Sequence, residues 1–409
     1  MQYRVDEKSG NKLSVLGFGC MRYPRIVAVT DREKAEALTL SAIEKGVNYF
    51  DTAYNYPESE VVLGEILHKN EKRSKVFVAT KLPHQKCKVY EDFDRIFNEQ
   101  LRRLKTDYID YYLIHNLSEV ISWARLCELG IERWIAEKKQ AGQIRQIGFS
   151  FHGTQPDFMA LLDAYDWELC QIQYNYMNEN YQAGRAGLKK AHSKGMPVII
   201  MEPLLGGKLA TGLPKEAERQ FKAAEVAGAA GDSAADGTIA DDSRTPASWA
   251  LRWLWNQPEV TVVLSGMNSE AQLEDNVATA SEAQVGMLSK REAAVFDPVI
   301  AALKKTDKIP CTGCNYCMPC PNRVNIPSSF AAYNASYSLG FISGMTMYLT
   351  SIGMNNPEKN YSGRNCIKCG VCEKKCPQHI KIMGSLEDVI KHMEPFWLNG
   401  LMWIVRKVS

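Results

Sequence analysis

Short apolar runs alternate with amphipathic stretches from residue 13 to about residue 280. A short apolar run bounded by turn residues is typical of a buried strand, whereas an apolar residue every third or fourth position predicts a helix. Strands that alternate with helices in this way form parallel sheets, because each crossover helix returns the chain to the same edge. The pattern predicts eight strands, at 17–19, 48–51, 76–80, 108–114, 144–150, 169–174, 197–201 and 260–264.

Helical patterns lie between these strands, for example at 32–45, 59–67, 91–104, 130–141, 186–194 and 247–255. Eight strand–helix units predict an α/β fold, a (β/α)8 TIM barrel over residues 1–288. Residues 212–244 interrupt the rhythm, because they are rich in Ala, Gly, Ser and Asp and lack an apolar stripe after Phe221. We expect a mobile excursion there, which either closes over a bound molecule or is simply solvated.

Eight of the twelve cysteines lie in the last quarter of the chain, in two runs that each end in Cys-Pro. A 4Fe-4S cluster needs four thiolates, and a compact three-Cys turn with a distal Cys-Pro is the spacing of bacterial two-cluster ferredoxins. We therefore expect a linker helix at 289–309, a small ferredoxin-like domain with two 4Fe-4S clusters at 310–390, and an apolar tail at 391–409. Paired zinc knuckles and a disulfide framework are the alternatives.

In two-cluster ferredoxins the last cysteine of each run ligates the other cluster. The same rule predicts one ligand set of Cys311, Cys314, Cys317 and Cys376, and a second set of Cys366, Cys369, Cys372 and Cys320. The first run departs from the usual spacing, because only Met318 and Pro319 separate Cys317 from Cys320 where three residues are expected.

The chain length and the net charge limit the classes of function to consider. A chain of 409 residues exceeds one ordinary core and suggests two domains. A formal net charge of +2 gives no strong field, so a small molecule is a better expectation than nucleic acid. The chain contains no run of eighteen apolar residues, so the sequence predicts no membrane-spanning helix. The polar residues 1–10 carry no apolar signal region, so we expect a cytoplasmic, reducing location.

Candidate chemistry lies at the predicted strand ends, where catalytic groups of such barrels gather. Asp51, Lys81 and His115 end the second, third and fourth strands, and Tyr56 follows Asp51 by five residues. A nearby ammonium stabilises a phenolate and lowers the pKa of a tyrosine. We expect Tyr56 to protonate a developing alkoxide, Lys81 to tune it, Asp51 to hold Lys81 by an ion pair, and His115 to bond a carbonyl oxygen.

These four residues, together with the stretches 147–150, 171–175, 203–204 and 273–276, are the basis of a family resemblance. Over about residues 10–280 the chain resembles the aldo-keto reductases, and as a whole it looks like their iron–sulfur-bearing branch. The resemblance implies a barrel that binds NAD(P)H across its mouth and reduces a small carbonyl substrate. It makes Tyr56 the general acid, Lys81 and Asp51 its tuning pair, and His115 the residue that orients the substrate.

The resemblance also implies a set of cofactor contacts. Ser150 and Gln171 match positions that hold the nicotinamide carboxamide, the stretch 203–207 matches the pyrophosphate loop, and 265–276 matches the adenosine end. The implied contacts are Gly19, Cys20, Met21, Asp51, Ser150, Gln171, Met201, Pro203, Leu204, Gly206, Lys208, Ser265, Gly266, Met267, Gln272, Asp275 and Asn276.

Three positions depart from the family pattern. Met201 replaces a tyrosine that stacks on nicotinamide, Phe151 replaces an asparagine that binds the carboxamide, and Gln272 stands where an arginine often meets the 2'-phosphate. The choice between NADP and NAD is therefore open, although Lys208 or Arg244 could supply the missing charge.

The two halves handle electrons differently, because a hydride carries two electrons and a cubane cluster normally passes one. A flavin usually bridges such a mismatch, and no flavin motif is visible. Three hypotheses follow: a carbonyl reductase with structural or partner-binding clusters, a cluster-linked oxidoreductase with a flavin or redox protein partner, and a non-catalytic electron-transfer scaffold. A homo-oligomer is compatible with each of them.

Overall fold

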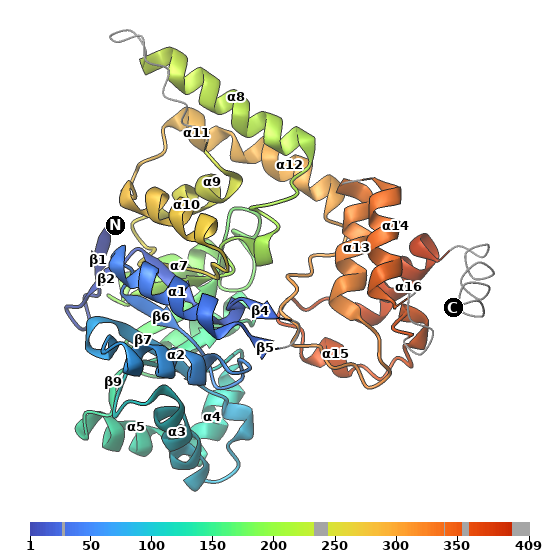
Figure 1. The fold of residues 1–409 in the computed structure, drawn as a ribbon. Helices are drawn as coiled ribbons and strands as arrows, with labels where there is room; N and C mark the ends of the chain where they lie inside the picture. The colour runs from blue at the N-terminus through green and yellow to red at the C-terminus, as the bar shows by residue number, and fades with distance from the viewer. Residues whose placement is uncertain (27–28, 233–243, 339, 354–359, 395–409) are drawn as a thin grey trace. The chain divides into compact units, whose positions relative to one another are not determined.

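The computed structural model describes residues 1–409 except 27–28, 233–243, 339, 354–359 and 395–409. The chain forms two compact units (Figure 1), one of Met1–Leu204 with Ala247–Ser289 and one of Leu205–Pro246 with Lys290–Ser409. The break after Ser289 falls next to the expected domain end at 288. Residues 205–246, expected within the first domain, group with the second unit instead.

The first unit is a closed barrel of eight parallel strands (Figure 1), as the sequence predicted. Neighbouring strands follow the chain order, and β12 pairs with β3 to close the barrel. The strands are β3 (Leu16–Gly19), β6 (Tyr49–Asp51), β7 (Phe77–Leu82), β8 (Ile109–Ile114), β9 (Ile144–Phe151), β10 (Leu169–Gln173), β11 (Val198–Met201) and β12 (Val262–Ser265).

The six helices predicted in this region are present, with ends within two residues of the expected positions. The helices of the unit are α1 (Arg32–Glu44), α2 (Ser59–Lys69), α3 (Glu91–Leu104), α4 (Val120–Glu128), α5 (Ile131–Gln140), α6 (Gln155–Ala164), α7 (Gly184–Ser193), α9 (Pro246–Trp255) and α10 (Glu270–Ser281). Two short antiparallel hairpins, β1–β2 (Tyr3–Val5, Lys12–Ser14) and β4–β5 (Arg25–Ile26, Val29–Thr30), precede α1.

The barrel has two apolar layers because successive strand residues point to opposite faces. Outward residues such as Phe50, Ile172 and Val263 pack under the helices in one large core. Inward residues fill the barrel itself in a second, smaller core that includes Tyr49, Ala79, Tyr111, Leu113 and Leu169. The inner core leaves the next inward positions, at the strand ends, for polar side chains.

The excursion expected at 212–244 is wrong in its first part, because Lys215–Asp232 form the helix α8. Ala, Glu and Lys favour helices even where no continuous apolar stripe exists. Phe221 of α8 packs on Phe296 of α12, with ring centroids 6.0 Å apart. This contact gives α8 a tertiary partner that local sequence does not reveal. The rest of the expected excursion, 233–243, lies outside the described residues.

The remainder of the second unit is also helical. The expected linker helix consists of α11 (Lys290–Ala294) and α12 (Phe296–Thr306), and α13 (Ile326–Ser338), α14 (Phe341–Ser351), α15 (Val371–Lys374) and α16 (Ile382–Met393) follow. Residues such as Val324, Ile326, Phe330 and Leu386 form its core, against which most of the paired-run cysteines pack. Most of the apolar tail, 395–409, lies outside the described residues. None of the described helices combines the length and apolarity that a membrane span requires.

Candidate active site and cysteine sites

Strand alternation places the predicted catalytic residues at the barrel mouth. Asp51, Lys81 and His115 each follow by two positions an inward-facing core residue, namely Tyr49, Ala79 and Leu113. Because the side-chain period of a strand is two, the three polar side chains point inward above that core. The strands β6, β7 and β8 are neighbours in the barrel, so these three positions lie at the ends of adjacent strands.

Lys81 is a buried cation with only 1% of its surface exposed. Its Nζ donates hydrogen bonds to both Asp51 carboxylate oxygens at 2.7 Å and to the Thr52 carbonyl oxygen at 2.8 Å. Burial raises the pKa of the Asp51 carboxyl, and the Lys81 ammonium opposes that rise. Three acceptors therefore fix the position of the ammonium group.

Tyr56 and His115 lie beside this ion pair. The Lys81 Nζ lies 5.1 Å from the centroid of the Tyr56 ring. The rings of Tyr56 and His115 are 5.9 Å apart between centroids and nearly perpendicular, at 88°. The structure thus brings together all four residues that the sequence singled out.

The His115 imidazole is neutral at ordinary pH. Burial lowers its pKa well below the usual range, and the positive charge of Lys81 adds to that effect. A neutral imidazole carries one N–H and can donate it to a carbonyl oxygen without adding a charge.

The residues expected to hold a nicotinamide carboxamide lie on adjacent strands. Ser150 on β9 and Gln171 on β10 are register partners. The Ser150 Oγ accepts a bond from the Asn116 backbone N–H at 2.8 Å. The Gln171 Oε1 is buried without a hydrogen-bond partner in the part of the chain that the structure describes. Buried polar atoms are normally bonded, so this oxygen fits a ligand that brings an amide N–H.

The expected adenosine-side contacts also gather at one end of the barrel. A Cβ on Gly19 would lie 3.4 Å from the Ser265 carbonyl oxygen, so β3 and β12 end together. Asn276 of α10 donates to the Ser265 Oγ at 2.8 Å. Gln272 accepts from the Asn268 N–H at 3.0 Å and stabilises the start of α10.

The remaining expected contacts lie in the outer core or next to the ends of strands β3 and β11 and in α10. Met267 is buried in the outer core, and burial raises the pKa of the Cys20 thiol to about 12, which leaves it protonated. Pro203 and Leu204 follow β11 and Met201 ends it, whereas Met21 and Asp275 lie in the turn after β3 and in α10.

Arg22 is a basic candidate that the sequence reasoning missed. Its side chain packs on Gly266, because a Cβ added there would meet three Arg22 carbons at 3.0 to 3.2 Å. The available signal was its position directly after the predicted stretch 19–21.

The two basic residues proposed to compensate for Gln272 have acidic partners in the second unit. Lys208 pairs with Asp307 at 2.5 Å and donates to the Ile309 carbonyl oxygen at 3.3 Å. Arg244 pairs with Glu292. Gly206 belongs to the same unit.

The paired cysteine runs line two cavities in the second unit. One cavity is lined by Cys311, Cys314, Cys317 and Cys376. The other is lined by Cys317, Cys320, Cys366, Cys369 and Cys372. Each cavity thus combines cysteines of both runs, and all four ligands of each predicted set share a cavity. Apolar residues, including Ile326 in both linings, surround the sulfur atoms.

A parallel (β/α)8 barrel with these residues at its mouth is typical of an oxidoreductase. Residues 15–292 match the model of the aldo/keto reductase family, and the chain belongs to that family. Residues 310–381 match a 4Fe-4S dicluster domain, which decides between the cluster interpretation and the zinc and disulfide alternatives.

Named relatives cover the barrel. L-galactose dehydrogenase from Arabidopsis thaliana is 30% identical in an alignment of length 322 that covers 73% of this chain and 95% of that protein. L-glyceraldehyde 3-phosphate reductase from Escherichia coli O157:H7 is 23% identical over 333 residues, 74% of this chain and 93% of that protein. An aldo-keto reductase from Klebsiella pneumoniae, solved with NADPH, has a TM-score of 0.56 at 23% identity over 73% of this chain and 95% of its own.

Proposed function

We propose that this enzyme reduces a small carbonyl compound with NAD(P)H, with Tyr56 as the general acid. The observation that carries the proposal is the position of the Lys81 ammonium, bonded to Asp51 and 5.1 Å from the Tyr56 ring centroid. A cation at this distance stabilises a phenolate, so it makes the phenol a stronger acid. The relatives L-galactose dehydrogenase and L-glyceraldehyde 3-phosphate reductase support a hydroxylated substrate.

The roles of the side chains follow from their positions. NAD(P)H supplies the hydride when it is bound, and Ser150 and Gln171 would hold its carboxamide. The neutral His115 N–H orients the carbonyl oxygen. Tyr56 gives its proton to that oxygen as negative charge develops on it, and Lys81 stabilises the phenolate that remains. Asp51 keeps the ammonium in place.

In the second unit we propose two 4Fe-4S clusters, held by the two cysteine sets that line the cavities. Cys369 is the exposed member of the eight cysteines. That exposure favours a second candidate function, in which the clusters exchange electrons with a redox partner and an additional flavin links them to the barrel. This candidate requires dithionite-reduced clusters to be reoxidised by the carbonyl substrate without NAD(P)H.

Tyr56→Phe tests the main proposal. The variant should reduce aldehydes such as glyceraldehyde about 10²- to 10⁴-fold more slowly, because the general acid is gone. Its NADPH affinity, measured by fluorescence titration, should stay within a factor of about two, since the ring is retained. Turnover equal to that of the wild type would refute the acid role.

A further inference from the structure

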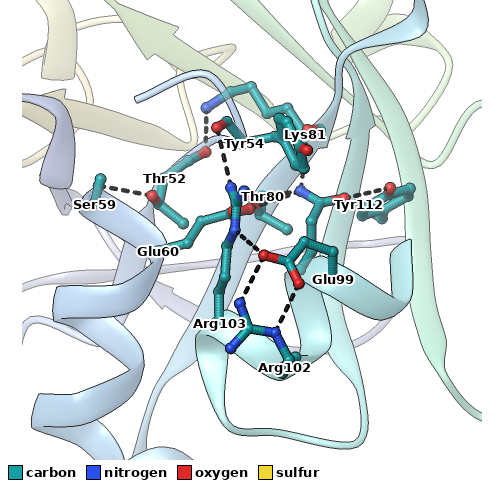
Figure 2. A network of polar contacts seen from close by, with 11 residues as sticks. Thr52, Tyr54, Ser59, Glu60, Thr80, Lys81, Glu99, Arg102, Arg103 and Tyr112 are labelled. Carbon is teal, nitrogen blue, oxygen red and sulfur yellow. Dashed lines mark hydrogen bonds and ion pairs between the residues drawn. The ribbon is translucent and has the colours of Figure 1, made fainter. Parts of the chain in front are cut away.

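A second buried carboxylate, that of Glu60, belongs to a network of polar contacts with Thr80 and Arg103 (Figure 2). Glu60 lies in the first turn of the helix α2 and is only 2% exposed. Its Oε1 accepts from Thr80 Oγ1 at 2.6 Å and from Gln100 Nε2 at 2.7 Å. Its Oε2 accepts from Arg103 Nη1 at 3.1 Å. Burial raises the pKa of Glu60, and these three donors oppose that rise.

Each donor to Glu60 is tied to a catalytic segment. Gln100 Nε2 also donates to the Lys81 carbonyl oxygen at 3.1 Å, and Thr80 precedes Lys81 on β7. Arg103 Nη1 also donates to the Tyr54 carbonyl oxygen at 3.4 Å, and its guanidinium lies 4.2 Å from the Tyr54 ring centroid. Tyr54 is in the loop that carries Tyr56. Glu60 therefore connects the backbone of Lys81 with the backbone beside Tyr56.

The same loop, residues 52–58, is held at its two ends. Ser59 Oγ bonds Thr52 Oγ1 at 2.7 Å and donates to the Cys20 carbonyl oxygen at 3.0 Å. Thr52 in turn accepts from the Lys81 ammonium. The middle of the loop is held by backbone bonds from Tyr56 to Ala53 and from Ser59 to Tyr56, and the Glu60 contacts through Arg103 add a connection to the Lys81 side.

We propose that Glu60 is a positioning residue that maintains the separation between the Lys81 ammonium and the Tyr56 phenol. This inference rests on the proposed acid role of Tyr56. The interaction of a charge with a developing phenolate weakens with distance, so a looser arrangement makes Tyr56 a weaker acid. A buried carboxylate with a cationic partner is costly to desolvate, and replacing such pairs often does not destabilise proteins. Stability alone therefore does not explain why the Glu60 carboxylate is buried here, whereas a role in fixing the geometry of the site does.

Glu60→Gln is the test, because it keeps the shape of the side chain and removes the charge that Arg103, Thr80 and Gln100 share. We expect kcat to fall about tenfold or more, with KM and the NADPH Kd within about twofold. The alkaline limb of the kcat–pH profile should move to higher pH by about half a unit, because a less stabilised phenolate has a higher pKa.

Glu99→Gln is the matched control (Figure 2). Glu99 also accepts from Arg103, at 2.8 Å, but among the described residues it bonds neither Thr80 nor Gln100, so it does not connect Arg103 with the Lys81 segment. It should keep wild-type kcat and the wild-type alkaline limb. If Glu60→Gln lowers only the melting temperature and leaves the limb in place, Glu60 is merely structural and the inference is overturned.

Two further measurements keep the outcome decisive. If Glu60→Gln does not fold, Thr80→Val can replace it, because this change removes one donor to Glu60. The alkaline limb of kcat should then shift in the same direction by less, and an unmoved limb again overturns the inference.

Tyr56→Phe separates the positioning role of Glu60 from the acid role of Tyr56. Full activity in that variant ends the acid role, whereas its inactivity combined with an unshifted Glu60→Gln limb ends only the positioning role.

Discussion

At the scale of single residues, burial decides which charges the site can use. Lys81 is accommodated because Asp51 and Thr52 accept all of its donors. The buried histidines behave differently from Lys81, because burial favours their neutral form. His115 is neutral through burial and the field of Lys81, and burial lowers the pKa of His84 to about 4. One fixed cation beside neutral imidazoles suits the proposed acid role of Tyr56, because a nearby cation stabilises a phenolate.

The low pKa of His84 makes stability depend on pH. An unfolded histidine titrates near 6.5, so between about 4 and 6.5 the unfolded chain binds more protons than the folded one. Stability contributed by neutral His84 is therefore complete above pH 6.5 and is lost as the pH falls toward 4, by up to roughly 3 kcal/mol. His84→Gln should flatten this loss in urea unfolding followed by tryptophan fluorescence.

His68→Gln is the control for this measurement, because His68 is exposed near the end of α2. It should retain the wild-type slope of stability against pH between 4 and 6.5. An equal slope in the wild type and in His84→Gln would show that His84 does not carry the effect.

At the scale of elements, local pattern explains most of the barrel. Short apolar runs marked the strands, and polar residues at the ends of these runs marked Asp51, Lys81 and His115. Contacts between distant segments were not predictable in this way. Phe221 of α8 packs on Phe296 of α12, and the Glu60 network joins α2 to α3 and β7, so neither contact leaves a local pattern.

The approach of α2 to α3 depends on Gly64. A Cβ at this position would lie 2.3 Å from the Arg103 carbonyl oxygen, a distance that backbone atoms cannot accommodate without moving. Gly64→Ala should separate the two helices and reduce the free energy of unfolding by about 1–3 kcal/mol. Because Arg103 moves with α3, the alkaline limb of kcat should shift as in Glu60→Gln.

Gly384→Ala is the matched helical substitution, because a Cβ there meets no atom within 4 Å. It should leave barrel unfolding and the pH profile as they are in the wild type, since alanine favours helices. An equally stable Gly64→Ala would mean that α2 and α3 can separate freely, contrary to the close packing of the two helices.

At the scale of the whole molecule, two chemistries share one chain. The barrel residues favour a two-electron hydride reaction, whereas each proposed cluster exchanges single electrons. The cysteine runs and their crossed ligand sets were predicted from the sequence, and the structure adds that each set lines one cavity. The cavity linings combine the two runs, which supports crossed ligation despite the short interval between Cys317 and Cys320.

Crossed ligation makes a prediction that distinguishes it from two self-contained runs. Cys376→Ser should lose the cluster of the first run, because Cys376 lines the cavity of Cys311, Cys314 and Cys317. Its iron content should fall from about eight to about four atoms per chain, and the electron paramagnetic resonance spectrum of its reduced form should match that of Cys311→Ser.

The second cluster provides the reciprocal test, in which the spectrum of Cys320→Ser should match that of Cys366→Ser. Cys127→Ser is the control, because Cys127 is a half-buried cysteine of α4, and this variant should keep the signals of both clusters. If Cys376→Ser instead matches Cys366→Ser, each run holds its own cluster and the crossed assignment is wrong.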